Sequence, residues 1–124
     1  MSRSTTAAEP GRSALQNLPA READARVAWR HLGTWVLAEI GVRDVVRDDK
    51  NGWLQMRIGP GRLYRKLIVV LRADDTYAIE IGVMRRHQGL PEFFSVATVG
   101  TDQGLYADQL GEQVRELYRR VMSA

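Results

Sequence analysis

The sequence of 124 residues contains no cysteine and no long hydrophobic run. The lack of cysteine excludes disulfides, cysteine-based zinc sites and thiol nucleophiles, and it agrees with a reducing compartment. No segment approaches the ~20 apolar residues that span a bilayer, and residues 1–18 lack the apolar core of a signal peptide. We therefore expect a cytoplasmic protein that does not enter a membrane.

Residues typical of catalytic and metal sites are also scarce. Histidine occurs only at His31, on the side of an expected helix away from its apolar stripe, and at His87, in an expected loop. Ser95 lies outside any G-x-S-x-G turn, and the Gly-Pro-Gly run at 59–61 lacks the pattern of a phosphate-binding loop. Most aspartates fall at turns, where they are common for structural reasons, rather than in the carboxylate cluster of a metal nuclease. We expect no catalytic residue, no metal, no cofactor and no enzymatic activity.

Lysine is rare, and the positive charge that is present is unevenly distributed. Sixteen of the 18 basic residues are arginine, a bias that a GC-rich bacterial or phage genome also produces. Residues 50–86 contain eight basic and three acidic residues, although the net charge of the chain is only +3. A fixed basic surface attracts anionic partners over about 8 Å at physiological salt. We expect a bacterial, phage or mobile-element protein with a basic central region.

The chain is long enough for one domain with a single core. Residues 1–18 are rich in small and polar residues without an apolar period, so we expect a disordered tail followed by one domain at 19–124. Two helices are expected. The first, at 19–40, ends at Gly41, and the second, at 103–122, is capped by Thr101 or Asp102. Their apolar stripes contain Ala25, Trp29, Leu32, Val36 and Ile40 in the first helix and Tyr106, Leu110, Val114, Leu117 and Val121 in the second.

Between the helices the apolar period falls to two, and turn residues recur at short intervals. This pattern predicts five strands at 42–48, 53–58, 62–73, 76–86 and 93–99. Short connections favour antiparallel neighbours. We therefore expect an α+β fold of order α-β-β-β-β-β-α, in which a five-stranded antiparallel meander carries both helices on one face.

The alternation also assigns side chains to the two faces of the sheet. A three-residue loop at 74–76 would set Leu71 opposite Ile79, and the 59–61 turn would set Leu54 opposite Leu67, all facing the helices. The other face would then be open, with a basic and aromatic end and an apolar end. Because a solvated sheet face should be mainly polar, this composition favours an interface. The tail or a loop covering the face would be the alternative.

The order of elements is similar to that of secretion-chaperone-like folds over most of residues 19–122, a likeness in topology that implies no function. Double-stranded-RNA-binding domains have the same general order but begin their second helix with basic residues, whereas this chain has Thr101-Asp102-Gln103-Gly104 there. No family is therefore identified from the residues.

The leading hypothesis is a non-enzymatic protein-interaction module that uses the open sheet face to bind a partner protein or a second copy as a homodimer. Large rigid side chains would anchor the contact and cationic residues would orient it. The alternative is nucleic-acid binding by the basic and aromatic end of the same face. The predicted partner-binding residues are Trp53, Gln55, Arg57, Tyr64, Lys66, Ile68, Met84 and Arg86.

Overall fold

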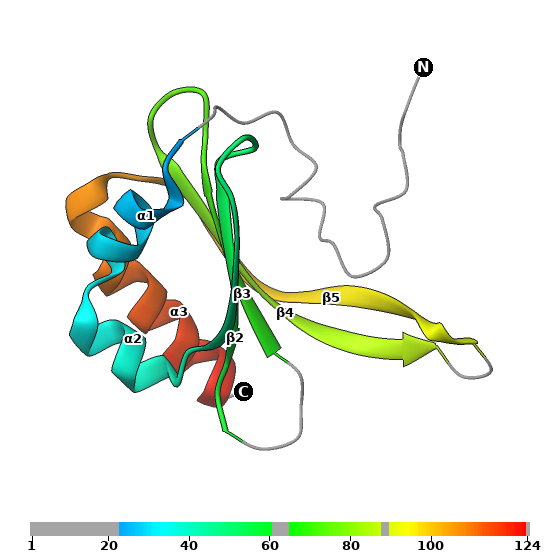
Figure 1. The fold of residues 1–124 in the computed structure, drawn as a ribbon. Helices are drawn as coiled ribbons and strands as arrows, with labels where there is room; N and C mark the ends of the chain where they lie inside the picture. Colours follow the sequence, from blue (N-terminus) through cyan, green and yellow to red (C-terminus); the bar gives the residue numbers. More distant parts are fainter. Residues whose placement is uncertain (1–22, 61–64, 88–89, 124) are drawn as a thin grey trace.

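The computed structural model describes residues 23–60, 65–87 and 90–123, with only the backbone described for 84–87 and 90–97 (Figure 1). The elements are α1 (Ala25–Leu32), α2 (Thr34–Ile40), β1 (Arg43–Asp48), β2 (Trp53–Ile58), β3 (Arg65–Leu71), β4 (Tyr77–His87), β5 (Leu90–Leu105), the 3-10 helix η2 (Ala107–Gln109) and α3 (Leu110–Ser123). The strands form one antiparallel sheet in the order β1-β2-β3-β4-β5, and the helices cover one of its faces (Figure 1). The predicted α+β meander is confirmed.

The main core lies between the helices and the sheet. Each helix contributes residues at helical spacing, and each central strand contributes every second residue, because side chains alternate across a strand. The buried residues of this core include Leu32, Ile40, Leu54, Met56, Ile58, Leu67, Val69, Ile79, Ile81, Leu110, Val114 and Leu117.

The first helix is broken, contrary to the prediction of one helix over 19–40. Asp24 caps α1 by accepting a hydrogen bond from the Arg26 backbone N–H, and α1 ends at Gly33, whose φ is 85° and ψ 149°. This conformation is almost restricted to glycine, so the chain turns a corner there and starts α2. Gly41 ends α2 in the left-handed conformation, at the position predicted.

The break changes which side chains are buried. α1 buries Ala25, Ala28 and Leu32, whereas Trp29 is partly exposed. The prediction that Trp29 is a core residue is therefore wrong, because Ala25, Ala28 and Leu32 form the buried side of α1.

The C-terminal region also differs from the prediction. Thr101 and Asp102 do not cap a helix but extend β5, where Thr101 pairs with Glu80 and its Oγ1 donates to the Ile79 carbonyl at 2.9 Å. The pairing continues to Leu105, and α3 begins only at Leu110. Pairing with β4 satisfies the backbone hydrogen-bonding groups of the end of β5, so the capping preference of Thr101 and Asp102 does not determine where the helix begins.

The predicted register is wrong by two residues, although the faces are right. Leu71 lies opposite Tyr77 rather than Ile79, and Leu54 lies opposite Val69 rather than Leu67. The Arg72 N–H bonds the Thr76 carbonyl, so the three-residue loop is 73–75 rather than 74–76. Within it, Asp75 has a positive φ of 68°, which aspartate tolerates better than most residues.

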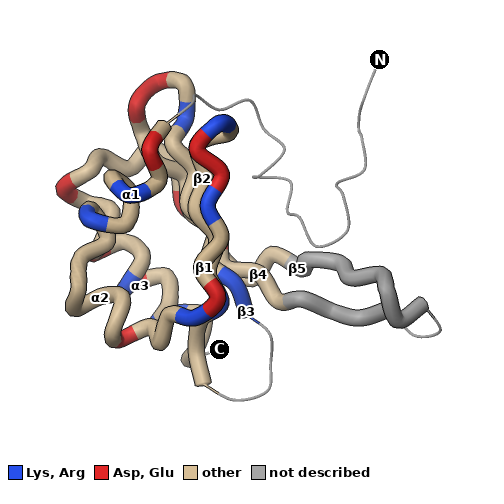
Figure 2. The backbone as a smooth tube through the Cα atoms, viewed as in Figure 1, with Lys and Arg blue, Asp and Glu red and all other residues tan. Residues whose placement is uncertain are grey.

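β4 and β5 extend well beyond the other strands. The last residue of β4 that pairs with β3 is Val83, opposite Arg65, and β4 then continues to His87 paired with β5 alone in the described chain. The two strands form an arm that projects from the side of the sheet opposite the helices (Figure 1). The basic residues of the described tube lie on both the helices and the sheet, interspersed with acidic ones (Figure 2).

Candidate functional site

The face of the sheet away from the helices contains most of the residues predicted to bind a partner. The register sets Trp53 beside Val70 and Ala78, Gln55 beside Ile68 and Glu80, and Arg57 beside Lys66 and Gly82. Of the predicted residues, Tyr64 lies outside the described residues. Met84 and Arg86 pair through their backbones with Val96 and Phe94, but their side chains also lie outside the description.

This face is not open, which corrects the prediction. Ile68 is 0% exposed and Lys66 1% exposed, and Trp53 is also buried, in a cluster with Ile68, Val70 and Ala78. Alternation correctly placed the described members of the predicted set, Trp53, Gln55, Arg57, Lys66 and Ile68, on one face. Their exposure, however, depends on what packs over that face. Trp53, Lys66 and Ile68 therefore cannot act as solvent-exposed anchors in this structure.

Two charged groups are buried on the same face. Lys66 Nζ donates to Gln55 Oε1 at 3.1 Å, and Glu80 Oε2 accepts from Thr98 Oγ1 at 2.7 Å. Buried charges are costly unless hydrogen-bonded, and polar neighbours on adjacent strands supply these bonds. Arg57 is half-buried, with its Nη1 4.0 Å from Asp44 Oδ2. The arrangement is a polar layer across the strands.

No cluster of histidine, aspartate and glutamate suited to a metal ion occurs among the described residues. His31, which the sequence placed on the side of the helix away from its apolar stripe, is exposed, with its Nδ1 3.1 Å from the Tyr77 hydroxyl and the two rings meeting edge to face. Burial raises the pKa of Tyr77, so its hydroxyl stays protonated at neutral pH and can share a hydrogen bond with this ring nitrogen. This contact ties α1 to β4.

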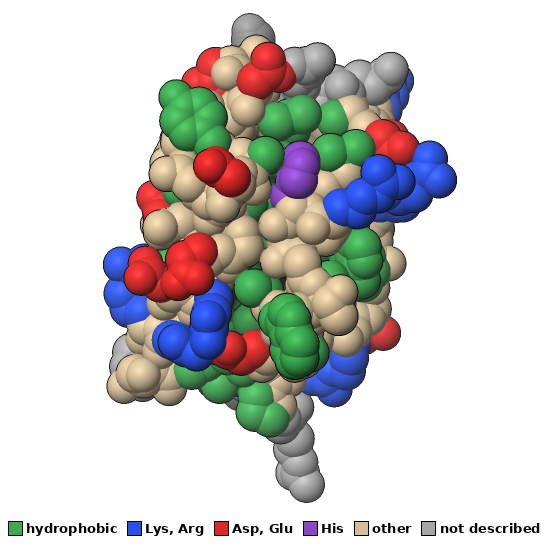
Figure 3. Space-filling model, turned by 90° about the vertical axis from the view of Figure 1, so that its left-hand side faces the viewer, with side chains coloured by type: hydrophobic (Ala, Val, Ile, Leu, Met, Phe, Trp, Pro, Cys, Tyr) green, Lys and Arg blue, Asp and Glu red, His purple; other side chains and the backbone are tan. Residues whose placement is uncertain are grey.

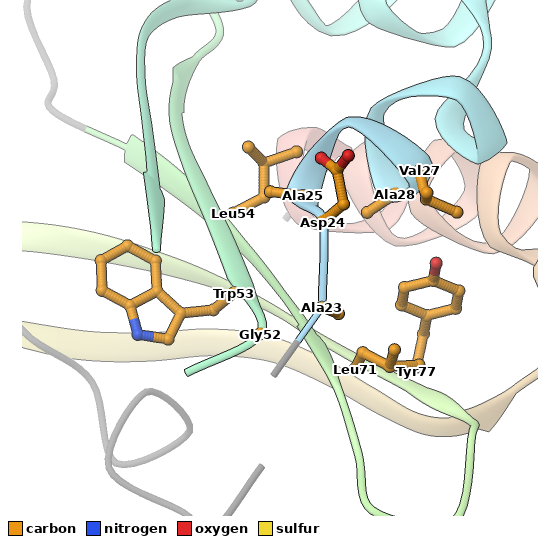
Figure 4. Close-up of a pocket in the computed structure, with 10 residues that line it drawn as sticks. All are labelled: Ala23, Asp24, Ala25, Val27, Ala28, Gly52, Trp53, Leu54, Leu71 and Tyr77. Carbon is orange, nitrogen blue, oxygen red and sulfur yellow. The ribbon is translucent and has the colours of Figure 1, made fainter. Parts of the chain in front are cut away.

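A small pocket lies between the first turn of α1 and the sheet. Its volume is about 130 Å³, and its walls include Val27, Leu54, Leu71 and Tyr77 (Figure 4). Pockets for small-molecule ligands usually have about 300–1,000 Å³. This one is large enough for a single small apolar group, and the Asp24 carboxylate at its rim already pairs with Arg26.

The most exposed large hydrophobic side chain among the described residues belongs to Trp35 on α2. It is 89% exposed and lines a shallow hollow of about 600 Å³ together with Val36, Ala38, Glu39 and Arg115. The face that carries the helices has several separate hydrophobic patches with charged groups between them (Figure 3). The sequence contained a signal for this site, a tryptophan outside the apolar stripe of its helix, but we did not predict it.

A network of charges borders this hollow. Glu39 accepts from Arg115 Nε at 3.0 Å and from Arg119 Nε at 2.9 Å, which joins α2 to α3. The hydrogen bonds from Arg119, followed by the charges of both arginines, lower the pKa of Glu39. The carboxylate is therefore ionised at neutral pH, and the hollow is bordered by charges of both signs.

A second exposed hollow of about 330 Å³ lies between α1 and β1. Ala25, Arg26 and Trp29 line it from α1, and Val45, Arg47 and Leu54 line it from the sheet. No residue lines both this hollow and the one at Trp35. The two surfaces are therefore separable by mutation.

Comparison with known proteins gave no matching family model, no similar curated protein and no similar solved structure. Among the described residues, no helix is both long enough and apolar enough to cross a membrane.

Proposed function

We propose that this protein is a non-enzymatic, cytoplasmic interaction module that self-associates through the α2–α3 surface around Trp35. The observation that supports this most is the 89% exposure of that tryptophan. An indole so exposed leaves about 200 Å² in water, roughly a quarter of what each partner buries in a standard interface. Tryptophan and arginine are also the side chains that most often dominate binding energy.

A second copy is the proposed partner because the surface is self-complementary. A two-fold interface requires one patch to present both the projecting group and the hollow that receives it. Trp35 projects at the rim of a hollow of about 600 Å³, large enough for an indole. Arg115, on the wall of that hollow, is placed to contact the face of an incoming ring.

The charges around the hollow support the same partner. Glu39 lies between Arg115 and Arg119, so the patch offers both an anion and cations to an identical patch. A partner of one charge sign would meet a repelling group, whereas a two-fold mate can set carboxylate against guanidinium.

This proposal keeps the predicted type of contact but moves it to another surface. A rigid aromatic anchor with neighbouring arginines was expected on the far sheet face, whose Trp53 and Ile68 are buried. The alternative of nucleic-acid binding has less support from that face. Lys66 is buried against Gln55 and does not reach solvent, and Arg57 is half-buried with Asp44 beside it, so the described part of this face presents little cationic surface to a phosphate.

The test is sedimentation equilibrium of the full chain over a wide concentration range, for the unmodified protein and for Trp35→Ser. We expect a dimer whose dissociation constant rises at least about thirtyfold in the variant, the effect of a hot-spot residue. Tyr106→Ser is the matched control, because Tyr106 is an exposed aromatic that does not line the hollow. A chain that stays monomeric at millimolar concentration, or a dimer indifferent to Trp35→Ser, would contradict the proposal.

The same samples test the alternative. Titration with a fluorescent single-stranded oligonucleotide at two salt concentrations should show no binding that depends on the sheet face. Salt-sensitive binding that Arg57→Ala weakens would favour the nucleic-acid function instead.

A further inference from the structure

The open edge of the sheet at β1 lies next to the hollow formed with α1. We propose that this α1–β1 groove binds an extended segment of a different protein, which adds to the edge of β1 and places an apolar side chain, flanked by acidic residues, in the hollow. This inference concerns a surface separate from the one around Trp35. It can therefore fail or succeed independently of self-association.

The hollow fits one large apolar side chain. Its volume is about 330 Å³, and Trp29 of α1 and Val45 of β1, both partly exposed, line it. Leu54 of β2 lies at its base and is buried. A helix and an edge strand that border an apolar groove form the geometry in which an extended peptide gains main-chain hydrogen bonds and side-chain specificity together.

Only a short length of the β1 edge is available for pairing with an added strand. β1 pairs with β2 on one side, has no other strand partner among the described residues, and is exposed over its first five residues. Pairing with β2 is regular from Val46 to Asp48, while an irregularity lies between Arg43 and Val46. The Asp49 carbonyl, just past the strand, accepts from the Ala23 N–H and closes that end. Only a few main-chain bonds are therefore available, and the side chain in the hollow must supply much of the affinity.

A second copy of β1 is a poor occupant of this edge. A two-fold axis normal to the sheet would pair two antiparallel copies of β1, in which directly opposed residues have their side chains on the same face. The axis must therefore pass through one residue, which lies opposite its own copy, rather than between two residues. The irregularity between Arg43 and Val46 puts Arg43, which pairs with Arg57, and Arg47, which pairs with Leu54, on opposite faces of the sheet. A register centred on Val45 or Val46 would therefore have to pair the regular end of the strand with this irregular stretch. Centring on any charged residue sets it opposite its own copy. Directly opposed like charges destabilise strand pairing, so these registers are disfavoured as well.

The charges in the groove indicate the chemistry of the partner. Both charged residues that line it, Arg26 and Arg47, are cationic. Arg26 bonds Asp24 through Nε and Nη2, and Arg47 bonds Asp49 through the same two nitrogens. Their hydrogen bonds within the described chain do not use Nη1. An arriving carboxylate can accept from these nitrogens, and such charge-assisted bonds are stronger than neutral ones.

The experiment uses the full chain, labelled with ¹⁵N, and a capped seven-residue peptide. The probe has a central phenylalanine flanked by glutamates and then by valines and threonines. A second peptide replaces the glutamates with lysines, and a third carries N-methyl groups at alternate backbone positions. Amide and indole NMR shifts give the location of binding, and their titration gives its affinity.

We expect the acidic peptide to shift the β1 amides and the Trp29 indole. The lysine and N-methylated peptides should bind at least about tenfold more weakly, because one loses the charge pairing and the other the main-chain bonds. Val45→Lys should weaken the acidic peptide at least about tenfold by filling the hollow, whereas Trp35→Ser should leave its affinity unchanged. Val45 is partly exposed, so this substitution should leave the fold intact, which circular dichroism checks.

Absence of binding at about 1 mM peptide, equal affinity for the acidic and lysine peptides, or shifts elsewhere that ignore Val45→Lys would each overturn the inference. Trp29→Ala gives a second variant should Val45→Lys not fold. It removes the other wall of the hollow and should weaken the acidic peptide at least about tenfold, and an unchanged affinity would also overturn the inference.

Discussion

β1 and β3 belong to the same sheet and each contains two adjacent valines, yet they lie in opposite environments. In β3, Val69 and Val70 are buried on the two faces of the sheet. In β1, Val45 and Val46 are 45% and 48% exposed. The difference arises from the sheet order, because β3 lies between β2 and β4 whereas β1 is an edge. Valine favours a strand in both cases but does not by itself determine burial.

The flanking residues distinguish the two strands better than the valines do. β1 reads RDVVRD, with charges on both sides of the valine pair, whereas β3 reads RKLIVVL and continues with apolar residues. Charged residues on an edge strand reduce pairing with other chains, which suits β1. β3 has one charge, Lys66, that is buried, and its ammonium bonds Gln55. The comparison of β1 with β3 shows that a single charged residue does not identify an edge strand, whereas charges on both sides of the apolar residues do so here.

The largest expected effect tests this difference with one chemical change at two positions. Val69→Ala should cost about 2–3 kcal/mol of unfolding free energy, because it removes buried methyl groups and leaves a cavity. Val45→Ala should cost less than about 0.5 kcal/mol. Urea unfolding of both variants measures the costs. Equal costs would mean that β1 is as well packed as β3.

A smaller effect concerns the buried charge of β3. Lys66→Met should cost about 1–3 kcal/mol, since it leaves the Gln55 side-chain oxygen without the ammonium donor. Adding Gln55→Leu should recover much of that loss, because two apolar side chains can replace a buried polar pair. The Lys66→Met and Gln55→Leu losses are also measured singly. If the double variant loses more stability than the two single losses added together, Gln55 contributes more through other partners than through Lys66.

The smallest effect concerns the ion pairs that hold the start of α1 beside β1. Hydrogen bonds from the Arg26 side chain, and then from its backbone N–H, lower the pKa of Asp24 from 3.8 to about 2. A lowered carboxyl pKa stabilises the fold above the unfolded value and loses that contribution as the pH falls through the folded value. Asp24→Asn retains a good helix cap without the charge. The stability advantage of the unmodified chain over this variant should therefore shrink between about pH 4 and pH 2.

Thermal unfolding of both proteins across that range measures the difference. Val45→Ala, which leaves every titratable group in place, is the control and should follow the pH profile of the unmodified chain. A constant difference between the Asp24→Asn variant and the unmodified chain would mean that the Asp24 charge contributes nothing to stability.

The sequence predicted what depends on local alternation. β2 begins and ends where expected, Gly41 ends the N-terminal helical region, and the described members of both sheet faces were assigned correctly. The register was not predicted, because shifting a three-residue loop by one position preserves the faces. The extent of β5 was missed because residues 101–105 favour a helix cap locally but pair with β4 in the sheet.

The candidate site was less predictable than the fold. Periodicity placed Ile68 and Lys66 on the correct face but could not show that both are buried there. The two surfaces argued above depend instead on Trp35, Trp29 and the open edge of β1. The exposure of Trp29 and Trp35 depends on the helix break at Gly33 and on packing between elements, and the position of β1 at the edge depends on strand order.

Gly33 has a consequence for how the Trp35 surface can vary. A Cβ added at this glycine would meet no atom within 4 Å, so a substitution there would cost backbone strain and no steric clash. The glycine nevertheless sets the direction of α2, and with it the direction in which Trp35 points. The geometry of the Trp35 surface is thus encoded at a position outside it, while its chemistry is encoded at Trp35 itself. The direction and the chemistry of this surface can therefore change through separate single substitutions.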